Sequence, residues 1–277
     1  MPLKYPLIQI PKDIKGSKFL TPITQVQGST TTAFYSILEP GKHSKMYRHN
    51  NCEVISILLK GSGLYGIGQS VIPAKIGDCG LITKGTEHFF LNTSNEQAIM
   101  VGFFIGAKDI NDAGIEEIEQ VNKSKSKYFI DEKKIESKDG VVVNINDVTP
   151  EKMDENDGWK ITDFRLPISA KNGSSSTLFR ARFMPGAVHK KHCHNNCDEI
   201  YYIISGYGLA GAGSDRIEVR GGHFHFIPKG VEHWLYNLSE KDPIEVVGVY
   251  CKAGSVIDTG YVYTGDVTTK DLEERTT

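Results

Sequence analysis

The chain has 277 residues, which exceeds the usual size of a single domain and favours two packed domains. Hydrophobic residues make up 39% and aromatic residues 9%, enough for sizeable cores, so wholesale disorder is excluded. A net charge of −2 offers no basic surface to a nucleic acid, and no run approaches a membrane span, so we expect neither kind of partner. The N-terminus lacks the pattern of a secretory signal and the five cysteines lack CxxC spacing, so we expect reduced thiols and a cytoplasmic protein.

The first part of the chain, residues 1–110, is predicted to be one β domain. Its clearest run is EVISILLKGSG from Glu53, which is rich in β-branched residues and ended by glycine. Residues 111–156 differ in character, because IEEIEQVNKSKSKYFIDEKKIESKDG has few positions able to face a core. We interpret this stretch as a charged linker with a short helix or an edge strand, with a partner-binding surface as the alternative.

Residues 157–277 are predicted to be a second β domain. The runs LFRARFMPG, EIYYIISGYG and HFHFIPKG are β-branched or aromatic and end at glycine or proline. Neither half contains a helical stripe of useful length. Several short strands at regular spacing are typical of a sandwich or barrel, so each half should form a small antiparallel barrel or jelly roll.

The two halves repeat one another. HNNCEVISILLKGSGLYGIG from His49 aligns without gaps with HNNCDEIYYIISGYGLAGAG from His194. The same offset of 145 residues also aligns Glu87-His88 with Glu232-His233. A repeat in one register indicates two copies of one fold.

The second copy carries a candidate metal site. Gly186 is followed after five residues by His192-Cys193-His194, after four more by Glu199 and after six more by Gly206. Alternation along a strand places both histidines on one face, and a neighbouring strand can bring Glu199 to the same point. A second block begins at Gly222, passes through Pro228-Lys229-Gly230 and reaches His233 and Asn237. Three imidazoles and one carboxylate suit one divalent ion, with Fe(II) or Mn(II) favoured and Ni, Cu, Co or Zn possible, and leave positions open for a substrate.

These two blocks, GX5HXHX4EX6G and GX5PXGX2HX3N, resemble the two-part signature of the cupin superfamily. The duplication makes the chain similar to a bicupin, which implies an all-β fold of two tandem jelly-roll barrels, also called double-stranded β-helices. The resemblance implies the metal ligands His192, His194, Glu199 and His233. Cupin barrels commonly associate through sheet faces and terminal arms, so the leading segment LKYPLIQIPKDI is a candidate arm for a homodimer.

The first copy lacks half of this set. His49 and His88 match His194 and His233, but Tyr47 stands in place of His192 and Val54 in place of Glu199. Two imidazoles without a carboxylate make a poor site for a hard divalent ion. We expect no metal there and a packed interior, with a ligand pocket as the alternative.

Three further residues are candidates for catalysis. Arg182 stands where oxalate-handling bicupins carry a substrate-gripping arginine, which implies a carboxylate clamp, with a surface arginine as the alternative. Tyr201 shares the strand face of Glu199 and either reaches the pocket or packs in the core. Asp258 falls where those enzymes place a lid residue, which implies a general acid or base, with an exposed turn residue as the alternative. His223 and His225 share one strand face and either support the ligands from behind or are ordinary strand histidines.

The ligand set leaves three functions open for a small-molecule substrate. The first is an oxygen-using, dioxygenase-like oxidoreductase acting on a small organic acid or an enolisable or phenolic compound, which experience with bicupins favours. The second is a non-redox metalloenzyme, namely a decarboxylase, isomerase or lyase. The third is a small-ligand-binding cupin without catalysis.

Overall fold

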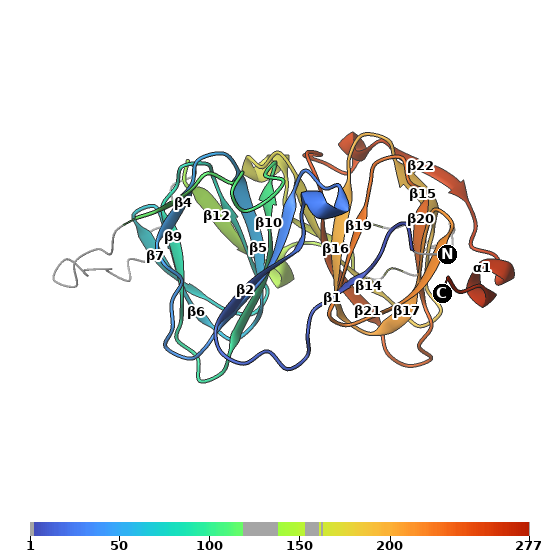
Figure 1. Ribbon diagram of the computed structural model, residues 1–277, viewed down its shortest axis with the longest axis horizontal. Coiled ribbons are helices and arrows are strands. Elements are labelled where there is room, and N and C mark those ends of the chain that lie inside the picture. The colour runs from blue at the N-terminus through green and yellow to red at the C-terminus, as the bar shows by residue number, and fades with distance from the viewer. Residues whose placement is uncertain (1–2, 119–137, 153–160, 162, 277) are drawn as a thin grey trace. The chain divides into compact units, whose positions relative to one another are not determined.

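The computed structural model describes residues 3–118, 138–152, 161 and 163–276 (Figure 1). The chain forms two compact units, called here the N-terminal and C-terminal barrels. The N-terminal barrel comprises Asp13–Asp147 and Lys171–Ser174, and the C-terminal barrel comprises Met1–Lys12, Val148–Ala170 and Ser175–Thr277. Each unit is built from two antiparallel sheets, so the predicted all-β tandem jelly rolls are confirmed.

The N-terminal barrel contains a six-stranded sheet in the order β12-β8-β5-β10-β3-β2 and a five-stranded sheet in the order β11-β4-β9-β6-β7. The β-branched run beginning at Glu53 forms the long strand β5 in the middle of the larger sheet, where both faces are covered. The strands are β2 (Lys18–Ile23), β3 (Thr32–Leu38), β4 (Tyr47–His49), β5 (Glu53–Lys60), β6 (Gly63–Ile67), β7 (Ser70–Ala74), β8 (Asp78–Ile82), β9 (His88–Asn92), β10 (Ala98–Ile105), β11 (Ile115–Glu117) and β12 (Gly140–Asn144).

The C-terminal barrel repeats this plan with the sheets β1-β19-β16-β21-β14-β13 and β18-β17-β20-β15-β22. Its strands are β1 (Ile8–Gln9), β13 (Arg165–Ile168), β14 (Thr177–Phe183), β15 (Val188–His194), β16 (Glu199–Ser205), β17 (Tyr207–Ala212), β18 (Asp215–Arg220), β19 (His223–Ile227), β20 (His233–Asn237), β21 (Ile244–Tyr250) and β22 (Tyr261–Gly265). The helices of the described chain are short: η1 (Gln25–Gln27), η3 (Ile145–Asp147), η5 (Ala170–Asn172), η6 (Ile257–Thr259) and α1 (Thr269–Glu273).

The stretch expected to be a charged linker with a short helix or an edge strand contributes two edge strands. β11 pairs with β4 and β12 pairs with β8, so both belong to the N-terminal barrel. Each supplies backbone partners to a strand that would otherwise lie at the edge of its sheet. Residues 119–137 and 153–156 of the expected linker lie outside the described residues.

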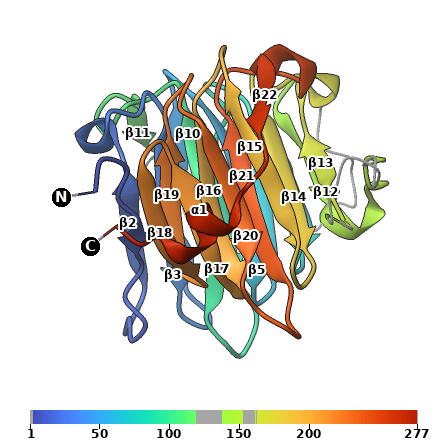
Figure 2. The same ribbon diagram turned by 90° about the vertical axis from the view of Figure 1, so that its right-hand side faces the viewer.

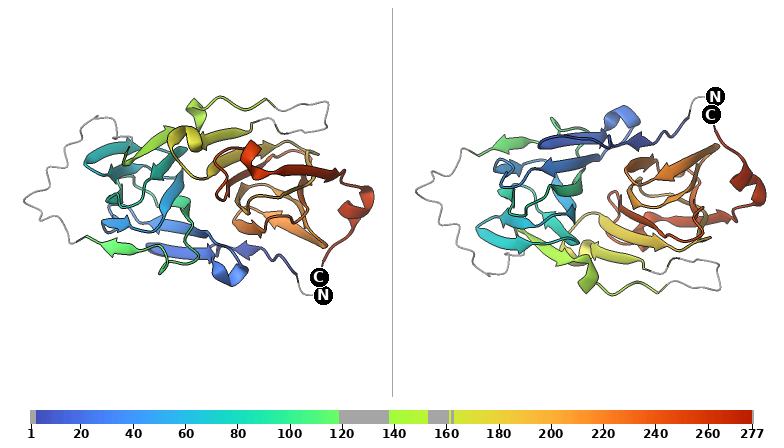
Figure 3. Two further views of the ribbon diagram at one scale, coloured as in Figure 1. Left: turned by 90° about the horizontal axis from the view of Figure 1, so that it is seen from above. Right: turned by 90° about the horizontal axis from the view of Figure 1, so that it is seen from below.

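The N-terminal segment was expected to belong to the first domain, residues 1–110, but it is part of the C-terminal barrel. β1 pairs with β19, and the Ile10 N–H donates to the Gly222 carbonyl at 2.9 Å. The backbone N–H groups of Lys4 and Tyr5 donate to the Asp215 carboxylate at 2.7 and 2.8 Å. Figure 3 shows this blue segment beside the orange strands. The expected terminal arm therefore covers the free edge of β19 in its own chain.

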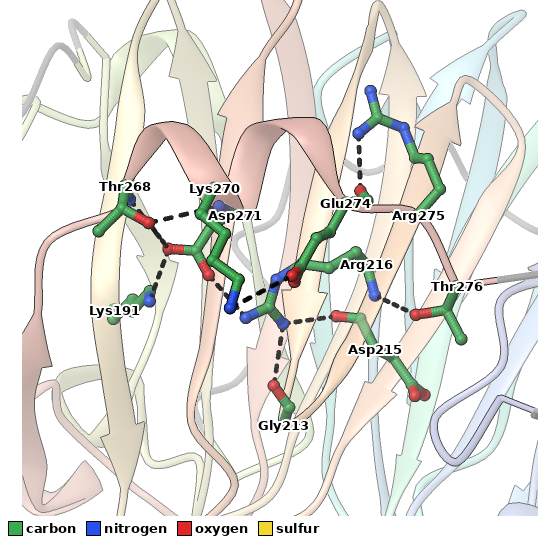
Figure 4. A network of polar contacts seen from close by, with 10 residues as sticks. All are labelled: Lys191, Gly213, Asp215, Arg216, Thr268, Lys270, Asp271, Glu274, Arg275 and Thr276. Atoms are coloured by element: carbon green, nitrogen blue, oxygen red, sulfur yellow. Dashed lines mark hydrogen bonds and ion pairs between the residues drawn. The ribbon is translucent and has the colours of Figure 1, made fainter.

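The C-terminal tail is fixed to the same barrel by one buried carboxylate. Asp271, in α1, accepts from Lys191 on β15 and from Arg216 on β18, each at 2.7 Å (Figure 4). The Asp271 carboxylate also accepts a hydrogen bond from the backbone N–H of Thr268, the N-cap residue of the helix, so Thr268 and Asp271 form a capping box. Figure 2 shows α1 lying across the sheet that contains β15 and β18. The tail thus bridges a strand that carries two of the predicted metal ligands and a strand at the sheet's edge.

A glycine at equivalent places in the two copies allows groups on the two flanking strands of its own sheet to approach closely. A Cβ on Gly102 would overlap the Phe34 ring and lie 2.7 Å from the Ile55 carbonyl oxygen. A Cβ on Gly248 would meet the Phe179 ring and the Ile200 carbonyl in the same way. Both glycines lie on the strand next to the β-branched run, so only a hydrogen fits at this position.

We predict that Gly102→Ala destabilises the N-terminal barrel by about 1–3 kcal/mol, because the added methyl group overlaps an aromatic ring and a backbone carbonyl. Urea denaturation followed by circular dichroism measures the effect. Gly80→Ala is the matched control on a neighbouring buried strand, since a Cβ there has only ordinary contacts at 3.5 and 4.0 Å. Equal midpoints for the two variants would contradict the close approach at Gly102.

We further predict that Asp271→Asn loosens α1. Burial alone would raise the pKa of Asp271, but hydrogen bonds from Lys191, Thr268 and Arg216 hold it well below its usual value. A carboxyl group with a lowered folded-state pKa stabilises the fold fully above its ordinary pKa of about 4, and this stabilisation is lost only in stronger acid. At pH 7 the variant should lose roughly 1.5–3 kcal/mol of local stability, the range for hydrogen bonds to charged groups.

Amide hydrogen exchange of residues 268–276 measures this loss. Glu274→Gln is the control, because its partner Lys270 is exposed and the pair spans one turn of the same short helix. Equal exchange rates in the Asp271→Asn and Glu274→Gln variants would show that the buried carboxylate does not hold the tail.

Candidate metal centre

The C-terminal barrel brings the four predicted ligands together. His192 and His194 share a face of β15, Glu199 opens β16 and His233 opens β20. One donor atom from each residue lies within 4.8 Å of all the others, and every one of the four residues is at most 5% exposed. Among the described residues this is the one group of three or more histidine, cysteine or acidic side chains with such spacing.

The hydrogen bonds around the ligands determine which imidazole nitrogens face the centre. His192 Nδ1 lies 2.7 Å from the Lys190 carbonyl oxygen, and His233 Nδ1 lies 3.0 Å from that of Val231. A carbonyl oxygen only accepts, so both Nδ1 atoms carry the proton and both Nε2 atoms present lone pairs. This is the orientation in which metal-bound histidines are usually held.

The inner nitrogens of two histidines face a carboxylate. Glu199 Oε2 lies 3.1 Å from His194 Nε2 and 3.2 Å from His233 Nε2. Burial raises the pKa of Glu199, whereas protonated His194 and His233 rings beside it would hold that pKa well below its usual value, so the carboxylate needs a positive charge nearby to stay ionised. An ionised carboxylate and imidazole lone pairs in a water-poor interior repel one another unless a cation lies among them. The donor set therefore fits a divalent metal ion.

A cavity of about 590 Å³ opens beside these ligands. His194, Glu199 and His233 form part of its wall, and most of the remaining wall is apolar or aromatic. Lys190 supplies the one positively charged side chain among the described lining residues. Its place follows from strand alternation, because Lys190, His192 and His194 occupy alternate positions of β15.

Tyr201 lies in the wall of this cavity, as its shared face with Glu199 predicted. Its hydroxyl is 2.7 Å from His225 Nδ1, and His225 Nε2 is 3.1 Å from the Tyr5 carbonyl. Because the carbonyl only accepts, Nε2 carries the proton and the Tyr201 hydroxyl donates to Nδ1. Burial lowers the pKa of His225 to about 4 and raises that of Tyr201, so both groups are neutral at pH 7. His225 therefore holds the protonated Tyr201 hydroxyl in place at the wall of the cavity.

Three tyrosines of the site were missing from the sequence prediction. Tyr261 and Tyr263 come from β22, which pairs with β15, and the Tyr261 ring stacks on His192 with centroids 5.0 Å apart. Tyr250 lies opposite Glu199 on β21, and its ring is 5.0 Å from that of His194. The alternation of YVYTG could have indicated the first two, but their pairing with β15 is not visible in the sequence.

Arg182 does not reach the cavity. On β14 the residues Phe179, Ala181 and Phe183 line the cavity, so Arg182 points to the opposite face of the sheet. There its guanidinium lies 3.6 Å from the Glu245 carboxylate on β21. The predicted carboxylate clamp at Arg182 is therefore wrong, and the alternation of the run LFRARF already contained the reason.

Asp258 also lies away from the cavity. It is an exposed residue of η6, where its carboxylate accepts a hydrogen bond of 2.8 Å from the Ser255 hydroxyl. Its backbone carbonyl accepts from the Asn196 amide at 3.1 Å. The structure therefore gives Asp258 a turn-stabilising place, and the aromatic residues of the following strand face the site instead.

The equivalent place in the N-terminal barrel is hollow. His49 and His88 lie with ring centroids 4.9 Å apart, beside Tyr47 and Val54. A cavity of about 530 Å³ adjoins them, so the expected packed interior is wrong. No acidic side chain lines this cavity among the described residues, and the donor set for a divalent ion is incomplete there.

Comparison with known proteins establishes the family. A model of the cupin domain matches residues 34–104 and 179–250, which together make up slightly more than half of the chain. The chain therefore belongs to the cupin family, with one domain in each barrel.

Individual relatives are distant. The oxalate-binding protein of Thermotoga maritima is 26% identical over 106 residues, which are 37% of this chain and 88% of that protein. Oxalate decarboxylase from Bacillus subtilis superposes with a TM-score of 0.69 at 15% identity, covering 93% of this chain and 76% of its own. Procruciferin, an 11S globulin from Brassica napus, superposes with a TM-score of 0.67 at 11% identity, covering 90% and 84%. At these identities the structural likeness shows the fold alone.

The described part of the chain contains no helix that is long and apolar enough to cross a membrane.

We predict that the protein binds one divalent metal ion per chain and that His233→Ala removes it. Mutation of a residue that hydrogen-bonds to a metal ligand typically lowers metal affinity by about 10- to 100-fold, so loss of a direct ligand should lower it by at least about 100-fold. Elemental analysis of protein purified without added metal measures the content. His88→Ala is the matched control, because His88 occupies the same place in the other copy. Equal metal content in the two variants would contradict the assignment.

Proposed function

We propose that the protein is a metal-dependent enzyme of the lyase or decarboxylase type, acting on a small organic acid in the C-terminal barrel. The observation that carries this proposal is the buried set of three histidines and one glutamate beside a cavity with a single cationic side chain, Lys190. The similarity to proteins named for oxalate binding and oxalate decarboxylation supports an acid as substrate. Such a metal would be Mn(II) or Fe(II), and the decarboxylase of Bacillus subtilis has Mn(II) centres.

His192, His194, Glu199 and His233 would hold the metal, which when bound supplies a Lewis acid for a substrate oxygen. The remaining roles fall to the protein's own side chains. Lys190 pairs with a carboxylate of the substrate, and the aromatic walls keep water away from the reacting atoms. Dry surroundings strengthen both interactions.

We assign the role of proton donor to Tyr250, which lines the cavity beside Glu199 and His194. Burial and the nearby Glu199 raise its pKa well above the ordinary value, so its hydroxyl stays protonated. When the bond from carbon to the carboxylate breaks, the electron pair stays on carbon and carbon dioxide leaves. The Tyr250 hydroxyl then gives its proton to that carbon, and solvent restores the proton to the tyrosine.

The substrate should be larger than oxalate. A cavity of about 590 Å³ far exceeds the volume of a two-carbon dianion, and no arginine lines it among the described residues. Phe179, Trp234 and Leu235 offer apolar surface to a substituent on the acid. We therefore infer an acid with an aromatic or branched apolar group.

An oxygen-using, dioxygenase-like reaction is the second candidate. The aromatic walls favour it, because they would suit an enolisable or phenolic compound and dissolved oxygen as well as an acid. The ligand set is the same for both chemistries. Formation of a product distinguishes both reactions from the third possibility, ligand binding without turnover.

A substrate screen under air and under nitrogen tests the proposal. The metal-loaded protein is incubated with aryl and branched aliphatic keto and hydroxy acids, and carbon dioxide, products and oxygen uptake are measured. Carbon dioxide release that is unchanged under nitrogen supports the lyase. Turnover that requires oxygen supports the dioxygenase-like reaction instead. Saturable binding without turnover in either atmosphere would leave a binding protein.

We predict that Lys190→Gln lowers kcat/KM for the acid substrate by about 10- to 100-fold, because a charge-assisted hydrogen bond contributes roughly 1.5–3 kcal/mol. Steady-state kinetics measure the change, and it should appear mainly in KM. Arg182→Gln is the matched control, since Arg182 faces Glu245 on the outer side of the sheet; its kcat/KM should stay within about twofold. A larger effect for Arg182 than for Lys190 would reverse our assignment of the carboxylate-binding residue.

A further inference from the structure

The cavity of the N-terminal barrel has no role in the proposed reaction. Its volume of about 530 Å³ falls within the range of about 300–1,000 Å³ found for small-molecule sites. The metal-binding carboxylate is replaced by Val54, yet the space beside it has not been filled by larger side chains. The N-terminal barrel thus lacks the complete metal-ligand set but contains a cavity large enough for a small molecule.

The wall of this cavity differs from that of the C-terminal cavity at one cross-strand pair. In the C-terminal barrel Tyr201 on β16 pairs with His225 on β19. The equivalent pair in the N-terminal barrel is Ser56 and Gly80, on β5 and β8. Ser56 lines the cavity, is 2% exposed and lies 3.5 Å from the hydroxyl of Tyr65, which lines the same cavity. A serine therefore takes the place in the cavity wall that a tyrosine takes in the other copy.

Aromatic rings form one continuous wall of the cavity. Phe19 stacks on Phe34 at 5.2 Å, Phe34 contacts Phe104 at 5.0 Å, and Phe104 contacts His49 at 4.8 Å between ring centroids. His88 continues the series beside His49. Phe19 is 47% exposed, so the series runs from solvent to the buried histidines. Offset and tilted rings at these spacings are the arrangement that a further aromatic ring extends favourably.

The buried part of the cavity carries no net charge. Lys18 and Lys45 are the charged side chains among its described lining residues, and both are exposed. Lys45 is already paired with Glu117 at 2.7 Å. Burial lowers the pKa of His49 to about 3 and also lowers that of His88, so both imidazoles are neutral at pH 7. A buried anion would find no charged partner there.

The two histidines provide the polar groups. His88 Nδ1 donates to the Thr86 carbonyl at 3.0 Å, so its Nε2 presents a lone pair. His49 is 4% exposed, and its Nδ1 has no hydrogen-bond partner among the described residues. A neutral imidazole carries one N–H and one lone pair, so His49 can donate where His88 accepts. A single hydroxyl group satisfies both, because it donates one hydrogen bond and accepts another.

We propose that the N-terminal barrel is a second, metal-free site that binds a small neutral aromatic molecule bearing a hydroxyl group, a ligand of the phenol class. The ring of the ligand lies against the aromatic wall, and its hydroxyl group bonds to His49 and His88. Ser56 lies in the wall of this cavity. This site is independent of the reaction proposed for the C-terminal barrel.

Calorimetric titration of the full metal-loaded chain tests the proposal with 2-naphthol as the probe. We expect saturable binding of one equivalent per chain. The anion 2-naphthoate is also a candidate ligand of the C-terminal cavity, so its binding to the N-terminal site is followed by the histidine ring signals of His49 and His88 rather than by heat. At that site 2-naphthoate and the hydroxyl-free 2-methylnaphthalene should bind more weakly than 2-naphthol. Naphthoate binding to that site as tightly as naphthol would overturn the proposal, as would the absence of saturable 2-naphthol binding.

Two variants locate the site. Ser56→Tyr introduces the residue found at the equivalent place in the other barrel and should weaken 2-naphthol binding at least about tenfold by filling the cavity; Ser56→Ala is its matched control and should bind normally. His88→Phe keeps a ring and removes the acceptor. It should weaken 2-naphthol roughly three- to tenfold, the worth of one net hydrogen bond, and leave 2-methylnaphthalene unchanged.

Histidine nuclear magnetic resonance identifies the occupied barrel even where a variant folds poorly. With ¹⁵N-labelled histidine, 2-naphthol should shift the ring signals of His49 and His88 in the unmodified protein. Shifts confined to His192, His194 and His233 would assign binding to the C-terminal cavity and refute the proposal. A second equivalent of metal that is lost in His88→Ala would also refute it, because the site would then be a metal site.

Discussion

The C-terminal barrel is organised around a local electrostatic conflict. Three imidazoles and a carboxylate converge in a space where each of the four residues is at most 5% exposed, and water cannot separate them. The carbonyl groups of Lys190 and Val231 hold the protons of two rings on the outer nitrogen, so the inner nitrogens cannot bond to Glu199 as neutral donors. A cation resolves the conflict, and the surrounding sheets hold the donors in position for one.

The first copy shows that the barrel itself does not depend on that cation. Val54 and Tyr47 replace the carboxylate and one imidazole, which removes the conflict. The packing that both copies share lies elsewhere, for example where Gly102 and Gly248 admit a neighbouring strand and an aromatic ring. Because the fold is maintained by such contacts, the interior of each copy was free to take its own chemistry. One interior holds charge and the other excludes it.

The sequence predicted what depends on spacing within a strand and failed where distant segments meet. The HXHX4E spacing and the second block identified the four converging residues, because alternation and one turn between strands fix their relative places. The prediction for Arg182 is wrong because it rested on the place of an arginine in oxalate-handling bicupins, whereas the alternation of β14 directs this side chain to the opposite face of the sheet. Lys190 could have been found by the same alternation. The pairing of β1 with β19 and of β22 with β15 joins segments far apart in the chain, and no local pattern specifies such pairs.

Those two pairings matter because they place both ends of the chain on the barrel that carries the ligands. β1 covers the edge of one sheet, and Tyr5 beside it fixes the proton of His225 and so the hydroxyl of Tyr201. β22 covers the edge of the other sheet, supplies Tyr261 against His192, and is followed by the helix that Asp271 ties to Lys191. A sheet edge must be covered in any case, because its backbone groups would otherwise pair with another chain. In this protein the covering segments also carry residues that face or support the cavity, so closing the barrel and completing the site are the same structural event.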